Sequence, residues 1–383
     1  ESMQSEKVRV LRHPFPFNYS EINNVAAQHA RGEYLVLLNN DTAVLHPEWL
    51  DNLLNHALRP EVGIVGAKLY YPSSTIQHAG VVMGITGPAG HVFSNAGRDS
   101  AGYMQRLQVD QNYSVVTAAC LMVRKSLYEE VAGLDEVNFR ISYNDVDLCL
   151  KVREAGYLVV WTPHVKLLHE SSVSQINTDT TAFKKKIERF QGEQLAMYRK
   201  WLPIMAADPA YNANFALTGN GFELETNVEL TWRPLPWRPQ PLVLLQRQLR
   251  WESADHRVTT PLDALRERAL LDGAVSTRLL SIAEVERLRP AAIVFQQTFE
   301  EPDFHALEVL AAVSPALRVL DLDRLPESGT DDPAFLRTLG LIDRVVVPVP
   351  ALAGALEGLH SDIRVVADYL PVDWKKNLSP QRR

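Results

Sequence analysis

Apolar positions in the first part of the chain follow two spacings, one typical of strands and one typical of helices. Residues 34–38 and 62–69 are short runs of mostly apolar residues, and such runs are expected of strands buried on both faces. Behind Pro47, apolar residues recur at helical spacing up to Leu58. Ser20 is the expected N-cap of an earlier helix that ends before Gly32. This alternation predicts an α/β architecture, which a short strand at residues 7–11 would open.

The pattern is interrupted between residues 72 and 112, where glycine and polar residues dominate and no period holds for long. An irregular stretch of this length in a compact domain is often functional. Strands are expected again at 114–123 and 157–161, with a helix at 144–155 between them. Ser126 and Glu129 have the spacing of a capping box, which predicts a short additional helix. A longer helix is expected at residues 183–201, with its run of three lysines on a solvated face.

A proline-rich stretch divides the chain. Residues 231–241 read TWRPLPWRPQP, and their four prolines exclude a regular helix or a central strand. Beyond them, buried strands are expected at 291–296, 317–322, 344–349 and 363–367, with helical stretches between them. This is the pattern of a Rossmann-like half-domain, although no glycine-rich phosphate loop follows a strand. The predicted organisation is a first domain over 1–202, a linker over 203–240 and a second domain over 241–383.

Composition narrows the classes of function. With 383 residues, 46% of them hydrophobic, the chain has material for two cores, and its net charge of −7 disfavours a nucleic-acid-binding surface. The two cysteines, Cys120 and Cys149, lie in apolar segments and are expected to be reduced core residues, which fits a reducing compartment. No apolar run reaches the roughly 20 residues that a transmembrane helix needs. A cytoplasmic location is therefore predicted, with peripheral contact at the inner face of a membrane left open.

Polar residues directly after the first apolar strand are candidates for ligand binding. Asn39, Asn40 and Asp41 follow residues 34–38, and ligands in open α/β sheets bind at the carboxyl ends of strands. A carboxylate there can hold a hard divalent cation, whereas the alternative is a polar turn before the next helix. His169 follows a later strand, and a lone histidine is usually structural. It becomes a candidate ligand only if it meets Asp41 in space.

Two carboxylates at the start of the helix at 144 are further candidates. Asp145 and Asp147 lie in its first turn, where the helix dipole favours negative charge, so helix capping is the alternative to catalysis. Residues two apart on a helix face different directions. Asp147 can therefore stabilise the start of the helix while Asp145 points into a cleft.

Together these segments resemble the family 2 glycosyltransferases of bacterial surface-polysaccharide synthesis, such as those of O-antigen assembly. The resemblance covers roughly residues 17–172 and depends on the order and spacing of its pieces. They are FNYSEINNVAAQHARGEYLVLLNNDT, IQHAGVVMG, GYMQRLQVDQNYSVVTAACLMVRKSLYEEVAGLDE, NDVDLCLKVREAGY and LLHESS. The resemblance implies a GT-A-like mixed sheet flanked by helices, whose first nucleotide-binding unit is missing. The second domain weakly resembles the N-terminal half of a GT-B glycosyltransferase.

The resemblance also implies roles for the candidates. Asn39-Asn40-Asp41 matches the Asp-x-Asp-like triplet that holds a divalent metal, Mn²⁺ or Mg²⁺, and the donor diphosphate. Asp41 is its surviving carboxylate, and His169 matches a histidine that can complete the metal site. Asn144-Asp145 matches a Glu-Asp pair whose second acid is the general base. Donor, sugar and acceptor contacts are further implied for Asn24, Thr117, Cys120 and Asn144.

The function that follows is inverting transfer of a sugar from a nucleotide-diphosphate donor to a polysaccharide or lipid-linked saccharide. A single in-line displacement needs a base for the acceptor hydroxyl and a cation for the leaving diphosphate, but no protein nucleophile. A non-catalytic scaffold or carbohydrate-binding module is the alternative that Asn39 and Asn144 favour. A nucleotidyltransferase is a third interpretation. The Asn144-Asp145 helix start followed by His169 argues against it.

Overall fold

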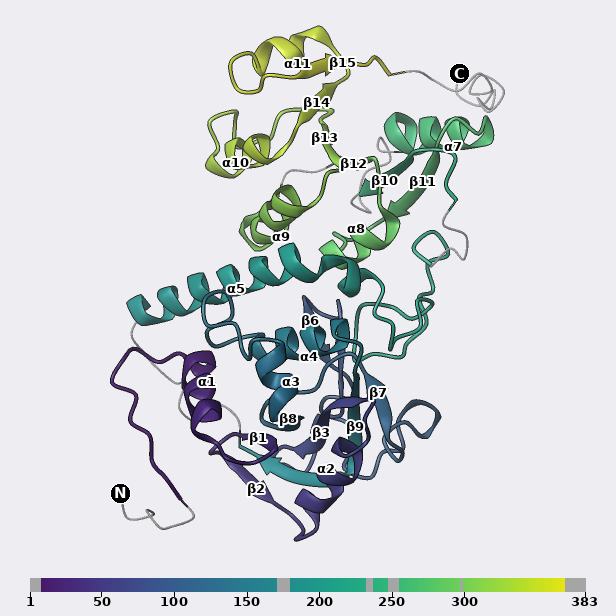
Figure 1. The fold of residues 1–383 in the computed structure, drawn as a ribbon. Coiled ribbons are helices and arrows are strands. Elements are labelled where there is room, and N and C mark those ends of the chain that lie inside the picture. The colour runs from purple at the N-terminus through teal and green to yellow at the C-terminus, as the bar shows by residue number, and fades with distance from the viewer. Residues whose placement is uncertain (1–7, 171–179, 232–236, 247–254, 297–298, 369–383) are drawn as a thin grey trace. The chain divides into compact units, whose positions relative to one another are not determined.

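The computed structural model describes residues 8–170, 180–231, 237–246, 255–296 and 299–368, and the chain divides into two compact units (Figure 1). The first unit comprises Glu1–Leu224 and the second Glu225–Arg383. Residues 203–224, which the sequence pattern assigns to a linker, belong to the first unit. They continue the helix α5 (Thr180–Ala206) and then place Tyr211, Phe215 and Phe222 in one aromatic cluster.

A mixed sheet of seven strands forms the centre of the first unit, and the predicted α/β sheet flanked by helices is confirmed (Figure 1). Its main path runs β1-β8-β3-β9-β2, with β4 beside β3 and β7 beside β9. Only the β3–β9 pair is parallel. The strands are β1 (Tyr34–Leu38), β2 (Thr42–Val44), β3 (Val62–Tyr70), β4 (Ile76–His78), β7 (Gln111–Tyr113), β8 (Cys120–Arg124) and β9 (Leu158–His169).

The apolar faces of the helices hold this sheet. Leu53 and Ala57 of α2 (Trp49–Ala57) join a buried cluster with Val65, Ala67 and Leu69 of β3. The helices α3 (Lys125–Glu130) and α4 (Asn144–Glu154) approach β3 at Gly63. A Cβ atom there would lie 2.4 Å from Val152 and 2.9 Å from Leu127, so the close approach requires glycine.

Several local predictions for this unit are wrong, and each error has a tertiary cause. The helix α1 (Tyr19–His29) is capped by Asn18, because Ser20 is buried and donates to the Phe139 carbonyl oxygen. The strand β1 is fully buried on one face only, because buried Leu35 and Leu37 alternate with residues that stay partly accessible or exposed. The short helix α3 begins after Arg124 without a side-chain cap, so the Ser126 capping box does not form. Residues 8–11 contain a single bridge residue instead of a strand.

The stretch between residues 72 and 112 is more regular than its composition suggests. Besides β4 and β7 it contains the hairpin strands β5 (Val81–Met83) and β6 (Ala89–His91), and a short 3-10 helix, η1 (Tyr103–Gln105). Conversely, β8 begins only at Cys120, while β9 is much longer than predicted and ends at His169. Three-residue strands carry too few side chains to show a period, and pairing with neighbours defines them.

The second unit is a six-stranded parallel sheet of order β11-β10-β12-β13-β14-β15, as expected of a Rossmann-like fold. The sequence pattern predicts four of its strands and misses β10 and β11. The strands are β10 (Leu242–Gln246), β11 (Asp272–Ser276), β12 (Ala292–Phe295), β13 (Leu317–Asp321), β14 (Arg344–Val347) and β15 (Ile363–Val365). The helices are η3 (Asp255–Thr259), α7 (Thr260–Glu267), α8 (Ile282–Leu288), α9 (Glu301–Val313), α10 (Pro333–Leu341) and α11 (Pro350–Ala355). Among the described residues, no helix combines the length and apolar character needed to cross a membrane.

Candidate functional site

Asp41 and His169 lie side by side where two neighbouring strands meet. The strands β2 and β9 pair so that Thr42 is opposite His169, which brings the residue before Thr42 beside the imidazole. The distance from Asp41 Oδ1 to His169 Nε2 is 3.1 Å. The Asn39 side-chain amide contacts the same nitrogen at 3.3 Å. The two candidate metal ligands and the first residue of the Asn-Asn-Asp triplet therefore converge on one atom.

The hydrogen bonds of Gln77 determine which nitrogen of His169 carries the proton. The Gln77 side-chain nitrogen donates to the His169 carbonyl oxygen at 3.1 Å, and the Gln77 amide oxygen faces imidazole Nδ1 at 2.6 Å. An amide oxygen can only accept, so Nδ1 must donate, and in a neutral imidazole Nε2 then carries the lone pair. This lone pair faces Asp41. Metal-binding histidines are commonly oriented by such a bond from the other ring nitrogen.

The Asp41 carboxylate keeps one buried oxygen without a donor. Its Oδ1 accepts no hydrogen bond in the described part of the chain, although it lies next to His169 Nε2. Two electron-rich atoms at this distance repel each other unless a proton or a cation lies between them. One carboxylate and one neutral imidazole fit a divalent cation that takes its other ligands from phosphate or water. No group of three or more His, Cys, Asp or Glu side chains suited to a metal occurs among the described residues, so a substrate would have to supply ligands.

Asp145 is half-buried at the start of α4, and two backbone N–H groups hold its carboxylate. The Ala118 N–H donates to Oδ2 at 3.0 Å, and the Val146 N–H donates to Oδ1 at 2.9 Å. Each carboxylate oxygen can accept a further bond, so this arrangement fixes its direction and leaves acceptor capacity for a substrate hydroxyl. Burial raises the pKa of the nearby Tyr19 hydroxyl, and the Asp145 charge raises it further.

Asp147 has a different environment, although it lies only two residues further along α4. Its side chain is fully buried, and Oδ1 accepts from Lys200 Nζ at 2.6 Å and from Trp201 Nε1 at 2.8 Å. Both partners lie on α5, so Asp147 ties α4 to α5. The neighbouring Asn144 is also buried and donates to the Ile141 carbonyl oxygen at 2.9 Å. Of the three polar residues at this helix start, Asp145 alone has the exposure that substrate contact requires.

Two histidines that the sequence reasoning missed lie on β4 and β6 and contact each other. His78 of β4 and His91 of β6 contact each other through their Nδ1 atoms at 2.9 Å, with the rings nearly perpendicular. Burial is the main cause that holds the pKa of His78 well below its usual range. Although His91 as a whole residue is exposed, burial of its ring lowers the pKa of the imidazole, and the charge of Asp145 opposes this shift. His91 is thus within electrostatic reach of Asp145.

The tautomers of this pair follow from one buried nitrogen. His78 Nε2 is buried and has no hydrogen-bond partner in the described part of the chain. A buried N–H without an acceptor is more costly than an unfilled lone pair, so Nε2 carries the lone pair and His78 Nδ1 carries the hydrogen. His78 Nδ1 therefore donates to His91 Nδ1. His91 consequently bears its own hydrogen on Nε2 and is a hydrogen-bond donor.

The remaining predicted residues differ in exposure. The Asn24 amide donates to Leu134 O at 2.9 Å and to Glu136 Oε1 at 2.8 Å, and it accepts from Leu134 N at 3.0 Å. Asn24 therefore holds the segment at residues 134–136 in place. Cys120 is 1% exposed and packs in the core, where burial raises the pKa of its thiol to about 12. The structure thus corrects the expectation that its side chain lines a pocket. Thr117 is half-buried and Asn40 is exposed, so both can still reach a substrate.

Comparison with known proteins identifies a family that the first part of the chain matches. Residues 1–132 match the family described as "Glycosyl transferase family 2". Over these residues the chain is similar to glycosyl transferase family 2. The resemblance inferred from the sequence is therefore confirmed, and the family 2 match includes Asn39, Asp41, His78 and His91.

Proteins similar to this chain occur in bacteria. The chain is 49% identical over 220 residues to the uncharacterized protein y4gI of Sinorhizobium fredii, covering 57% of this chain and 24% of that protein. It is 41% identical over 216 residues to the O-antigen biosynthesis protein RfbC of Myxococcus xanthus, covering 56% of this chain and 16% of that protein. The chain therefore spans a quarter or less of the length of these two relatives. Among solved structures, the mannosyltransferase PcManGT of Pyrobaculum calidifontis in complex with GDP-Man and Mn²⁺ aligns with a TM-score of 0.34 at 15% identity, covering 50% of this chain and 46% of that one.

Proposed function

We propose that the first unit transfers a sugar, with inversion, from a nucleotide-diphosphate donor to a polysaccharide or lipid-linked saccharide acceptor. The observation that carries this proposal is that Tyr19 links the two candidate centres. Its hydroxyl lies 3.3 Å from Asn39 Oδ1 and 3.5 Å from the Ala118 carbonyl oxygen, and the Ala118 N–H donates to Asp145 Oδ2. The candidate base and the candidate metal site are thus joined through Tyr19 and Ala118, and a single displacement requires such proximity. The family match and the O-antigen relative support a saccharide acceptor. A membrane-bound acceptor would bring the chain to a membrane surface, which remains a prediction.

Each residue has a defined task in this proposal. Asp145 accepts the proton of the acceptor hydroxyl as its oxygen attacks the anomeric carbon, and the Ala118 N–H keeps the carboxylate aligned for that transfer. Asp41 and His169 would hold Mn²⁺ or Mg²⁺ against the donor diphosphate. The bound cation would neutralise the charge that develops on the leaving group. Gln77 holds the imidazole of His169 in the tautomer that binds a metal.

His91 has the position of a sugar-binding residue in this scheme. The transferred sugar lies between the attacking hydroxyl and the leaving diphosphate, hence between Asp145 and the Asp41–His169 pair. A neutral imidazole that donates from Nε2 can bind a hydroxyl oxygen of that sugar without adding charge. His78 keeps this nitrogen protonated by donating to Nδ1 of the same ring.

His91→Phe is therefore expected to weaken binding of the sugar nucleotide but not of the matching nucleoside diphosphate. Loss of one neutral hydrogen bond of about 1 kcal/mol corresponds to a roughly five-fold weaker affinity. Calorimetric titrations with each nucleotide and its sugar-bearing form, in the presence of Mn²⁺, measure the difference.

His91→Gln is the conservative variant, because its amide can donate from a similar distance, and it should recover part of the affinity. The matched control is His29→Phe, at the exposed end of α1. Equal weakening for both ligands by His91→Phe would show that His91 does not contact the sugar.

The function itself is tested by incubating the chain with a panel of uridine, guanosine and thymidine diphosphate sugars. Release of nucleoside diphosphate is expected with one of these donors, and it should increase on addition of Mn²⁺ and fall with EDTA. A saccharide binder without catalysis would bind acceptor oligosaccharides and release no nucleotide from any donor. That outcome would favour the scaffold or carbohydrate-binding alternative.

A further inference from the structure

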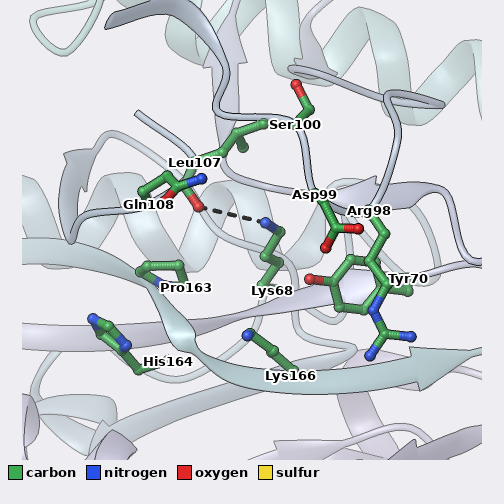
Figure 2. Close-up of a pocket in the computed structure, with 10 residues that line it drawn as sticks. All are labelled: Lys68, Tyr70, Arg98, Asp99, Ser100, Leu107, Gln108, Pro163, His164 and Lys166. Atoms are coloured by element: carbon green, nitrogen blue, oxygen red, sulfur yellow. Dashed lines mark hydrogen bonds between the residues drawn. The ribbon is translucent and has the colours of Figure 1, made fainter. Parts of the chain in front are cut away.

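A basic pocket opens beside β3 and β9, and Figure 2 shows the side chains that line it. Lys68 of β3 and Lys166 of β9 are direct partners in the strand register, and Arg98 and His164 lie at the exposed rim. The pocket has a volume of about 270 Å³. A second hollow of about 420 Å³ shares Arg98, His164 and Lys166 with it. The two hollows therefore form one groove with cations along its length.

Lys68 is a buried cation with little compensation. The residue is only 4% exposed, and the one side-chain hydrogen bond that it forms in the described part of the chain, from Nζ to the Leu107 carbonyl oxygen, is long at 3.4 Å (Figure 2). The Tyr70 ring offers a weaker contact, with its centroid 5.5 Å from Nζ. An ammonium group has three N–H donors, and a buried charge is unfavourable unless it is paired. The pocket thus contains donors whose partner is absent from the described part of the chain.

The charges around Lys68 increase this imbalance. Asp99 is the one carboxylate that lines the pocket, and none of Lys68, Arg98 and Lys166 forms an ion pair within 4.0 Å in the described part of the chain. Burial, followed by the adjacent charge of Lys166, lowers the pKa of Lys68 to about 8, while Asp99 opposes the shift. The whole chain has a net charge of −7, so this cluster is not part of a generally basic surface.

We propose that this groove is a binding site for a diphosphate group, separate from the site at Asp41 and His169. Arginine binds phosphoryl oxygens through its planar fork, and lysine binds them as a point charge. Two adjoining hollows provide room for two phosphoryl groups and the start of the molecule that bears them. Side chains alternate along β9, so Lys166 and His169 project from opposite faces of the sheet. The diphosphate belongs either to a nucleotide or to a lipid-linked saccharide, and this proposal does not depend on transferase activity.

Titration calorimetry with inorganic pyrophosphate, in EDTA so that no divalent cation takes part, tests the site. We expect one molecule bound per chain, with an affinity that falls as salt rises. Lys68→Met removes the charge and keeps most of the side-chain volume. The substitution should lower the affinity for pyrophosphate about 10-fold or more, because this is the usual contribution of a hydrogen bond to a charged group. The matched control is Lys184→Gln, an exposed lysine on α5, which should change nothing.

Thermal unfolding without pyrophosphate shows whether Lys68→Met still folds. Because the substitution removes an uncompensated buried charge, the variant should melt at or above the temperature of the unsubstituted chain. A second variant, Arg98→Gln with Lys166→Gln, changes only exposed side chains and should also lose pyrophosphate. Absence of pyrophosphate binding, or equal binding by all variants, overturns the proposal.

Two further titrations distinguish the sources of the diphosphate. One uses uridine, guanosine and thymidine diphosphates, and the other uses a polyprenyl diphosphate in detergent micelles with the polyprenyl monophosphate as its control. A Lys68-dependent affinity for the nucleotides identifies a second nucleotide site. A Lys68-dependent preference for the lipid diphosphate identifies an acceptor site.

Discussion

Asp145→Asn is expected to slow sugar transfer by roughly 10²–10⁴-fold, the usual contribution of a positioned general base. The amide is nearly the same size as the carboxylate, and its one oxygen can still accept from one of the two backbone N–H groups, of Ala118 or Val146, so the fold should persist. What it loses is the ability to take a proton from the acceptor hydroxyl. Initial rates of transfer at saturating donor measure the effect, and donor affinity should change little because the base acts on the acceptor.

Asp51→Asn is the matched control for this experiment, because it makes the same change in an exposed aspartate in the first turn of another helix, α2. Its transfer rate should equal that of the unsubstituted chain. Near-normal turnover by Asp145→Asn would remove Asp145 from the role of base. Similar slowing of donor hydrolysis in water would instead indicate that Asp145 serves more than the acceptor.

Asp41→Ala is expected to abolish the Mn²⁺-dependent part of donor binding and to slow transfer by at least ~10²-fold. The substitution removes one of two protein ligands, and loss of several kcal/mol of leaving-group stabilisation corresponds to that factor because each ~1.4 kcal/mol is tenfold. The electron paramagnetic resonance signal of free Mn²⁺ measures binding independently of catalysis. It should fall when the unsubstituted chain and a nucleoside diphosphate are added, and not when Asp41→Ala replaces that chain.

Gln77→Leu tests the same site through the tautomer of His169. Without the Gln77 oxygen, the imidazole can place its hydrogen on Nε2, and Mn²⁺ affinity should fall roughly 10–100-fold, as for other residues that orient a metal ligand. Asp41 stays in place in this variant, so a smaller loss than in Asp41→Ala is expected. Unchanged Mn²⁺ binding in both variants would contradict a metal site at Asp41 and His169.

The helix that carries Asp145 could be predicted from the sequence because its signals are local. Residues 144–155 have helical spacing and a glycine beyond the end, and α4 spans Asn144–Glu154. The opposite environments of Asp145 and Asp147 also follow from the helical period, since residues two apart face different ways. The family could be inferred for a similar reason, because ordered short motifs survive in the chain whatever their packing.

Tertiary structure alone decided which distant residues meet. Gln77 and His169 are 92 positions apart, and they meet only because β4 and β9 both pair with β3, so that Gln77 sets the tautomer of His169. His78 and His91 are 13 apart and come together because a hairpin follows β4. Strands of three residues give no detectable period, so neither their pairing nor the histidine pair can be predicted from the pattern.

Burial was likewise decided by packing between elements. Cys120 and Thr117 are three residues apart, yet Cys120 is in the core as the first residue of β8, whereas Thr117 precedes the strand and is only half-buried. From its charge alone, Lys68 would be expected on an exposed face. The strand register instead places it beside Lys166, where the residue is buried and contacts Leu107. The sequence thus determined the family resemblance, the class of fold and the main helices, whose information is local. The tautomers, the orphaned Asp41 oxygen and the buried cation arise from contacts between residues far apart in the chain, which only the folded sheet brings together.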